Sequence, residues 1–459
     1  MPDVAVLSRI QFAMTIMFHY IFPPLSIGLS LLMAVMEGLY LKTGDRTFER
    51  MARFWSSIFA ANFAMGVATG VVMGFQFGTN WAGYARFVGD VFGPALAAEG
   101  ILAFFLESCF LGVLIFGWDR VPPKVHFFST LMVALGSALS AVLIVAANSW
   151  QQTPAGHVIV GSGALAKAQL VDPLAVLFNP SSVARLLHVL PGAYLQAAFA
   201  VMAVCAYYVL RRRHQDFARK GFSLGLGLGL ASALAMPATG HLQAVVVART
   251  QPAKLAAFEG LYTTRESAPL SLVGFPDDER KELRFSVEVP ALLSLLVHGP
   301  GGGKVAGLEE FPRADWPPVF LSFQLYHAMI ALGMAFIGWM VLSAFMLWRG
   351  KLFKSRLLML GSVAAAAGPY LANQLGWCAA EVGRQPWVVY GALRTQDAAS
   401  LGVPAGQVLA SIVMFGILYL CLFAVWVYVI GTKIENGPDE AVEKNDNGIG
   451  EGGKQRLPA

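Results

Sequence analysis

The chain has 459 residues, of which 56% are hydrophobic and only 13% are charged. Because a soluble domain carries about 25% charged residues, this composition excludes an ordinary soluble fold and indicates an all-α polytopic membrane protein. The formal net charge of +5 comes from Lys and Arg residues in short loops between apolar segments, so it argues against a nucleic-acid partner.

Nine windows of about twenty apolar residues predict a bundle of nine transmembrane helices. The windows cover residues 10–41, 54–77, 94–117, 127–149, 183–210, 221–247, 318–348, 357–378 and 405–430. The chain therefore divides into six spans within 1–247, a polar insert at 248–317, three spans within 318–431 and a polar tail at 432–459 that we expect to be disordered. The N-terminal run has no basic stretch and no cleavage site, so the first span should remain as an anchor.

Basic residues mark alternate connections between these spans. Clusters of Lys and Arg follow the first, third, fifth and seventh spans, whereas the other short connections are poor in both. The positive-inside rule therefore places the N-terminus outside and the C-terminus in the cytoplasm. The insert at 248–317 then lies outside, and an amphipathic stretch at 254–262 favours a functional loop over a disordered one.

The four cysteines exclude two kinds of site. They lie at positions 109, 205, 378 and 421, all inside apolar spans and without metal-ligand spacing. We therefore expect packing residues rather than a disulfide framework or a zinc site.

The third span carries two acidic residues, Glu99 and Glu107. On a straight α-helix they would lie about 12 Å apart along the axis and about 80° apart around it. Each costs about 2.5 to 3.5 kcal/mol at the centre of a membrane helix, so both should face a protein or water-lined interior. They either serve chemistry or form a hydrogen-bonded pair that only holds helices together.

Four side chains from different spans lie at one depth, about 8 to 17 Å below the outer surface. They are His19, Glu99, His188 and Met329, and Glu381 follows the eighth span in the same layer. Imidazole, thioether and carboxylate are axial ligands of haem iron, so the set suggests several haems. Each residue alone is weak evidence, because Met329 is one of 17 methionines and Met commonly fills cores.

The run Gly383 to Trp387 contains Arg384 beside Glu381. An Arg and a Trp at this height could be ordinary interface anchors. Alternatively, the guanidinium could pair with Glu381 or with a haem propionate.

Several long motifs resemble subunit I of the cytochrome bd quinol oxidases. They are LSRIQFAMTIMFHY from Leu7, NFAMGVATGVVMGFQFGTNW from Asn62, the acidic third span, QPAKLAAFEG from Gln251 and GRQPW from Gly383. The resemblance implies nine spans in the bacterial cytoplasmic membrane, a second membrane subunit, and room for a small accessory single-span subunit. It also implies a low-spin haem b, a high-spin haem b and a haem d or a further haem b. Such enzymes oxidise quinol at the outer face and reduce dioxygen to water with cytoplasmic protons, without pumping.

The resemblance also implies haem ligands. His188 and Met329 resemble the axial pair of the low-spin haem. His19, Glu99 and Glu381 resemble ligands or near-ligands of the two high-spin haems, without deciding which serves which. Trp377 resembles an aromatic residue between haems, and Arg9 a charge near them, while Arg384 joins the cofactor-binding set.

The same resemblance implies a proton route and a quinol site. Glu107, with Ser108 and His126, resembles the inner part of a route for cytoplasmic protons, and His126 should lie at its mouth. Lys254 and Glu259 resemble quinol-site residues of the outer loop, the Q-loop.

Two features depart from the family pattern. His327 stands where relatives have an Arg two residues before the axial Met, which removes a permanent positive charge beside the low-spin haem. The Q-loop is also short, which leaves ubiquinol and menaquinol both open. The rival class is a secondary transporter, but transporters favour paired repeats and broken helices, and the sequence shows no internal repeat.

Overall fold

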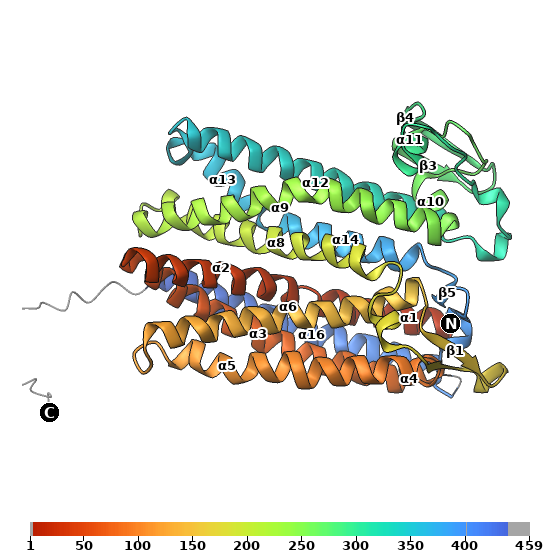
Figure 1. The fold of residues 1–459 in the computed structure, drawn as a ribbon, viewed down its shortest axis with the longest axis horizontal. Helices are drawn as coiled ribbons and strands as arrows, with labels where there is room; N and C mark the ends of the chain where they lie inside the picture. The colour runs from red at the N-terminus through yellow and green to blue at the C-terminus, as the bar shows by residue number, and fades with distance from the viewer. Residues whose placement is uncertain (1–2, 401, 439–459) are drawn as a thin grey trace, which may run out of the picture.

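The computed structural model describes residues 3–400 and 402–438, and it is a bundle of long helices that run side by side (Figure 1). Eight helices of the described chain are long and apolar enough to cross a membrane. The predicted eighth span at 357–378 is built instead from α13 (Arg356–Ala364), the 3₁₀ turn η6 (Ala365–Ala367) and α14 (Gly368–Val382). The prediction of an all-α membrane bundle is therefore confirmed.

The first span is two helices rather than one. α1 (Val4–His19) ends at His19, and α2 (Phe22–Thr43) begins after a short break. Pro23 stands in the first turn of α2, where a missing backbone N–H leaves no hydrogen bond unmade. The break places His19 at a helix end in the bundle interior rather than in the middle of a regular helix.

The third span contains a π-helical turn between its two acids. After α3 (Arg46–Thr79), the chain forms α4 (Ala82–Ala98), the π-turn η1 (Glu99–Phe104) and α5 (Phe105–Phe116). A π-turn inserts extra backbone into a helix and changes which side chains share a face. The angle of about 80° expected between Glu99 and Glu107 on a straight α-helix therefore does not apply.

Each of the remaining spans is one continuous α-helix that is close to its apolar window or longer. They are α6 (Pro123–Gln152), α8 (Ser182–Leu210), α9 (Gln215–Thr250), α12 (Val319–Trp348) and α16 (Ala405–Asn436). Two boundaries differ from expectation, because Glu381 lies inside α14 rather than after it, and α16 continues into the predicted tail at 432–459. The part of that tail from residue 439 onward lies outside the described residues.

Short elements cover the ends of the bundle. Between α6 and α8 lie β1 (His157–Val160), η2 (Gly163–Leu165), β2 (Lys167–Leu170) and α7 (Pro173–Leu177). After α12 comes η5 (Leu352–Lys354), and between α14 and α16 lie β5 (Trp387–Val389), β6 (Leu393–Arg394) and α15 (Thr395–Ala398). Strand pairs β1–β2 and β5–β6 are each antiparallel and two-stranded.

The insert at 248–317 is a small folded unit. It contains α10 (Pro252–Glu259), β3 (Leu270–Asp277), β4 (Glu282–Val289), α11 (Leu292–His298), η3 (Leu308–Glu310) and η4 (Arg313–Asp315). Its own apolar core includes Leu255, Leu261 and Leu293. The unit lies beside the N-terminal end of α12 and projects sideways from the bundle (Figure 1). The connections rich in Lys and Arg lie at the opposite end of the bundle.

Close helix contacts hold the bundle together. A Cβ added to Gly28 of α2 would lie 2.3 Å from the Ala197 Cβ of α8, so only glycine permits this approach. All four cysteines are free; Cys205 is buried in the central core, as expected of a packing residue. Cys109 and Cys421 are exposed on helix surfaces. They do not pack against the described residues of this chain in the way that was expected of all four cysteines.

Candidate functional site

One face of α6 contacts three of the acids predicted from the sequence, Glu99, Glu107 and Glu381. Side chains spaced three, four, seven or eight residues apart share a helix face, and this face carries a series of polar residues. The series is His126, Thr130, Ser137, Ser140, Asn148 and Gln152. Glu37, Glu107, Glu99 and Glu381 each bond to a member of the series from another helix.

The two acids of the third span are held by serines of α6. Ser140 Oγ donates to Glu99 Oε1 at 2.6 Å, and Ser137 Oγ donates to Glu107 Oε1. A Cβ on Gly136 would lie 2.9 Å from the Glu107 Cβ, so this glycine allows α6 to approach. The two serines are about 4.5 Å apart along α6, so one short stretch of α6 holds both carboxylates. Sequence reasoning named Ser108 here and missed both serines.

A second buried acid lies nearer the basic end of the bundle. Glu37 of α2 is only 3% exposed, and its Oε2 is 2.9 Å from His126 Nδ1. Thr130 Oγ1 donates to Glu37 Oε1 at 2.6 Å, and His126 Nε2 lies 3.2 Å from the Leu114 carbonyl oxygen. His126 is therefore buried rather than open at a mouth. Sequence reasoning overlooked Glu37, although a lone acid in an apolar span was the same signal that identified Glu107.

The two candidate ligand histidines have the same local environment. His19 Nδ1 lies 2.9 Å from Thr69 Oγ1, and His188 Nδ1 lies 3.1 Å from Thr239 Oγ1. Each threonine stands in an Ala-Thr-Gly triplet on a neighbouring helix, at 68–70 and 238–240. A Cβ on either glycine of these triplets would lie 3.3–3.4 Å from the imidazole Cε1. The repeated Ala-Thr-Gly triplet is visible in the sequence and could have identified the two threonines that contact the histidines.

The threonines determine which imidazole nitrogen is free. Thr69 Oγ1 donates to the Met65 carbonyl at 2.8 Å, so it accepts from His19 Nδ1–H. Thr239 Oγ1 likewise donates to the Ala235 carbonyl at 3.1 Å and accepts from His188. Within the described residues neither Nε2 has a hydrogen-bond partner, so each keeps a lone pair for a metal. This donor set fits haem iron, which needs only one or two protein ligands.

Met329 lies on α12 with its sulfur against α14. A Cβ on Gly376 would lie 2.7 Å from Met329 Sδ, so the glycine leaves room for the thioether. Trp377 follows Gly376 and is half-buried. α14 packs against both α12 and α8, so it stands between the helices of Met329 and His188. Met329 from α12 and His188 from α8 would offer a thioether sulfur and an imidazole nitrogen to a haem iron.

Arg9 and His19 lie on the same helix, α1. Arg9 is exposed on α1, and ten residues of helix separate it from His19, or about 15 Å. Its predicted place near a haem stays a prediction.

Glu381 lies in a charged cluster near the loop end of the bundle. Arg384 forms an ion pair with Glu381 and donates to Gln151 Oε1 at 2.9 Å. Asn148 Nδ2 donates to Glu381 Oε1 at 3.1 Å. Arg185 donates to the Asn148 side-chain oxygen. Sequence reasoning missed Arg185. Of the two alternatives for Arg384, the ion pair with Glu381 is observed.

The Q-loop helix α10 bonds directly to this cluster. Lys254 Nζ donates to Gln152 Oε1 at 2.9 Å and to the Ala380 carbonyl at 2.8 Å. Lys254 is buried, and burial lowers its pKa well below the usual value for an amine. The candidate quinol-binding helix α10 is therefore hydrogen-bonded directly to α14 and to the polar face of α6.

Glu259 occupies the other end of α10 in an apolar setting. It is buried, its Oε2 has no hydrogen-bond partner, and burial raises its pKa to about 8. The ring of neighbouring Phe258 stacks on Tyr326 of α12 at 4.5 Å. Such a carboxyl group is largely neutral at pH 7 and gains its charge only in alkaline conditions.

His327 links the Q-loop to α12. Its Nδ1 lies 2.9 Å from the Phe323 carbonyl oxygen, and its Nε2 lies 2.8 Å from the Ser271 carbonyl oxygen in β3. Ser271 Oγ also donates to the Glu259 carbonyl at 3.2 Å. His327, which stands where the family pattern has an Arg, thus holds β3 against α12. This contact lies two residues before Met329.

Comparisons with known proteins agree with this arrangement. The family described as "Cytochrome bd terminal oxidase subunit I" matches residues 7–438. "Cytochrome bd ubiquinol oxidase subunit 1" of Bacillus subtilis is 38% identical, over 95% of this chain and 94% of that protein. "Cytochrome bd-II ubiquinol oxidase subunit 1" of Escherichia coli is 33% identical, over 95% and 98%. A "Putative cytochrome bd menaquinol oxidase subunit I" of Bacillus subtilis is 35% identical, over 93% and 96%. The solved bd oxidase of Geobacillus thermodenitrificans superimposes with a TM-score of 0.87 at 29% identity, covering 95% of this chain and 99% of that one.

Proposed function

This chain belongs to the cytochrome bd terminal oxidases as a subunit I, and we propose how its residues divide the reaction. It is a haem-containing, multi-pass membrane subunit of a quinol:dioxygen oxidoreductase. In our proposal quinol is oxidised at the loop end, which faces outward, and protons enter from the basic, cytoplasmic end. Charge then separates across the bacterial cytoplasmic membrane without pumping.

Two histidines, a methionine and two acids would hold the haems. His188 and Met329 bind the low-spin haem b, and His19, Glu99 and Glu381 serve a high-spin haem b and a haem d or further haem b. When bound, these groups carry electrons from quinol to dioxygen. The free Nε2 atoms of the two histidines support this assignment, because Thr69 and Thr239 fix the tautomer that can ligate.

The quinol headgroup binds at α10. Glu259, held in an apolar setting beside Phe258 and Tyr326, accepts a proton from the quinol hydroxyl. Lys254 fixes α10 against α14 near Glu381. The named relatives include both ubiquinol and menaquinol oxidases, so the proposal specifies a quinol without its ring type.

Protons for dioxygen reduction follow the polar face of α6. The Glu37–His126 pair is the inner station, Glu107 with Ser137 the middle one, and Glu99 with Ser140 the outer one. We propose that a second membrane subunit of the bd oxidase covers part of the exposed helix surface and completes the entry to this path.

The observation that carries this proposal is the single face of α6, which contacts Glu37, Glu107, Glu99 and Glu381. Glu107→Gln preserves shape but cannot release a proton, so it should keep the haem spectrum and lower quinol-driven oxygen consumption by about 10²-fold or more. Ser137→Ala is the matched control, since it removes the hydrogen bond and leaves the acid. Its activity should fall by about 10-fold at most.

Oxygen consumption by purified enzyme and a reduced-minus-oxidised spectrum measure both effects. Equal activity of Glu107→Gln and the parent enzyme across pH would contradict a proton-carrying role. It would then favour a pair of acids that only holds helices together.

A further inference from the structure

The β3–β4 hairpin of the Q-loop exposes a continuous apolar surface. Its members, the apolar hairpin face, are Leu272, Val273, Phe275, Phe285 and Val287, each about half exposed or more. Phe285 is 78% exposed. Single exposed apolar residues are normal on a protein surface, but a contiguous group marks a contact with a partner or a membrane.

Phe285 combines an exposed ring with an unusual backbone conformation. Its φ angle is +52°, a left-handed conformation that an aromatic residue rarely adopts. The strand register also shifts between Val273 and Phe275, opposite this part of β4. Such strain persists where the surroundings impose it, often at functional positions. A partner for the exposed ring would supply the compensating stabilisation.

Contacts with α12 give the depth of the hairpin. Gln324 Nε2 donates to the Gly274 carbonyl at 2.8 Å, and His327 Nε2 lies 2.8 Å from the Ser271 carbonyl. These residues are about 8 and 12 Å below the start of α12. α12 has 30 residues and is about 45 Å long, so it exceeds a hydrocarbon core of about 30 Å by about 7 Å at each end. β3 therefore runs along α12 at the boundary between headgroups and acyl chains.

The direction of β3 places its charged turn farther from the membrane centre than the start of the strand. Ser271 contacts the deeper residue of α12 and Gly274 the shallower one, so β3 rises away from the membrane centre toward its C-terminal end. The turn after β3 at 278–282 is charged throughout. The charged turn thus lies on the water side of the hairpin, and Leu272, Val273 and Val287 lie on the membrane side. Glu288, which pairs with Ser271, is an exposed charged residue at the same depth, and it alternates with Val287 and Val289 along β4.

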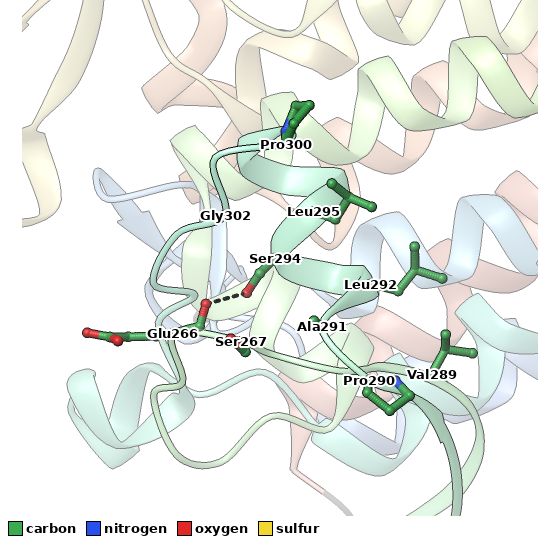
Figure 2. Close-up of a pocket in the computed structure, with 10 residues that line it drawn as sticks. All are labelled: Glu266, Ser267, Val289, Pro290, Ala291, Leu292, Ser294, Leu295, Pro300 and Gly302. Atoms are coloured by element: carbon green, nitrogen blue, oxygen red, sulfur yellow. Dashed lines mark hydrogen bonds between the residues drawn. The ribbon is translucent and has the colours of Figure 1, made fainter.

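The apolar surface continues onto α11. In Figure 2, the side chains of Val289, Leu292 and Leu295 point to the same side of the loop unit. They line a hollow of about 300 Å³ together with Pro290 and Pro300. Val289 lies two residues after Val287 on β4, so these two side chains share one face of the strand. The hollow therefore adjoins the apolar hairpin face at Val287.

We propose that the apolar hairpin face and α11 form a lipid-binding surface that inserts into the leaflet on the Q-loop side. The lipid-facing side of α12, where Phe320 and Leu321 are exposed in the first turn, continues onto this surface at the same depth. An amphipathic element at this boundary lies in the interface with its apolar side among the acyl chains. The insertion holds the Q-loop against the membrane from which a quinol arrives. It does not depend on the proposed haem or proton roles.

The test uses the purified complex in phospholipid nanodiscs. Phe285→Cys carries an environment-sensitive fluorophore, after Cys109→Ala and Cys421→Ala remove the exposed native thiols. Lys281→Cys in the charged turn is the matched control. We expect a nitroxide near the top of the lipid acyl chain to quench the label at 285, and aqueous iodide to quench it roughly five-fold less than the label at 281.

Three outcomes decide the proposal, each read only from samples that keep the parental haem spectrum. Strong nitroxide quenching with weak iodide quenching at 285 supports it. Equal iodide quenching at 285 and 281 overturns it, because the face is then in water. Protection from both quenchers at 285 also overturns it, because protein rather than lipid then covers the face. Val287→Cys repeats the measurement on the same face.

Discussion

Thr239→Val tests how the chain prepares His188 to bind a metal. The substitution keeps the β-branched shape but removes the hydroxyl that lies 3.1 Å from His188 Nδ1. The imidazole N–H is then buried without an acceptor, which costs about 1–3 kcal/mol. At 1.4 kcal/mol per factor of ten, haem affinity should fall by about 5- to 140-fold. Loss of a similar group behind other metal-binding histidines lowers affinity by about 10- to 100-fold.

The assay is haem content per protein, read by a pyridine haemochrome spectrum, together with the reduced-minus-oxidised spectrum. Thr239→Val should lose or shift the low-spin signal and leave the high-spin signals in place. Thr69→Val is the reciprocal control, because Thr69 holds His19, and it should affect a high-spin haem instead. If both variants perturb the same haem, or neither perturbs any, the inference that these threonines orient separate haem ligands is refuted.

Three further variants test other parts of the proposal. Quinol oxidation by the parent enzyme should rise as pH increases through about 8, where burial places the pKa of Glu259, and Glu259→Gln should abolish this rise; an unchanged kcat/KM profile would contradict this role. Met329→Leu should keep the fold and remove or shift the low-spin spectrum, and an unaltered spectrum would exclude Met329 as a ligand. Glu37→Gln should slow oxygen consumption by about 10-fold or more with all haems present; haem loss with unfolding would instead indicate a structural pair with His126.

The apolar windows were enough to locate the membrane helices, because the cost of exposing polar backbone and charge to lipid depends on each segment alone. The same local reasoning singled out Glu99 and Glu107, since an acid in an apolar span needs a partner wherever the span lies. It applied equally to Glu37, which was missed although the signal was present. The acidic third span and the motifs from Leu7, Asn62, Gln251 and Gly383 pointed to the family, which the comparisons confirm.

Which residues meet across helices was decided by the tertiary structure. The rotation of one helix against another is not encoded in any single window, so the pairing of Glu107 with Ser137, and of His188 with Thr239, could not be derived from spacing. The π-turn at Glu99 changed the helix face as well, because an inserted turn defeats a calculation based on a regular period. The polar face of α6 is visible as a helix pattern, but its acidic partners come from helices far apart in the chain, and only packing brings them to it.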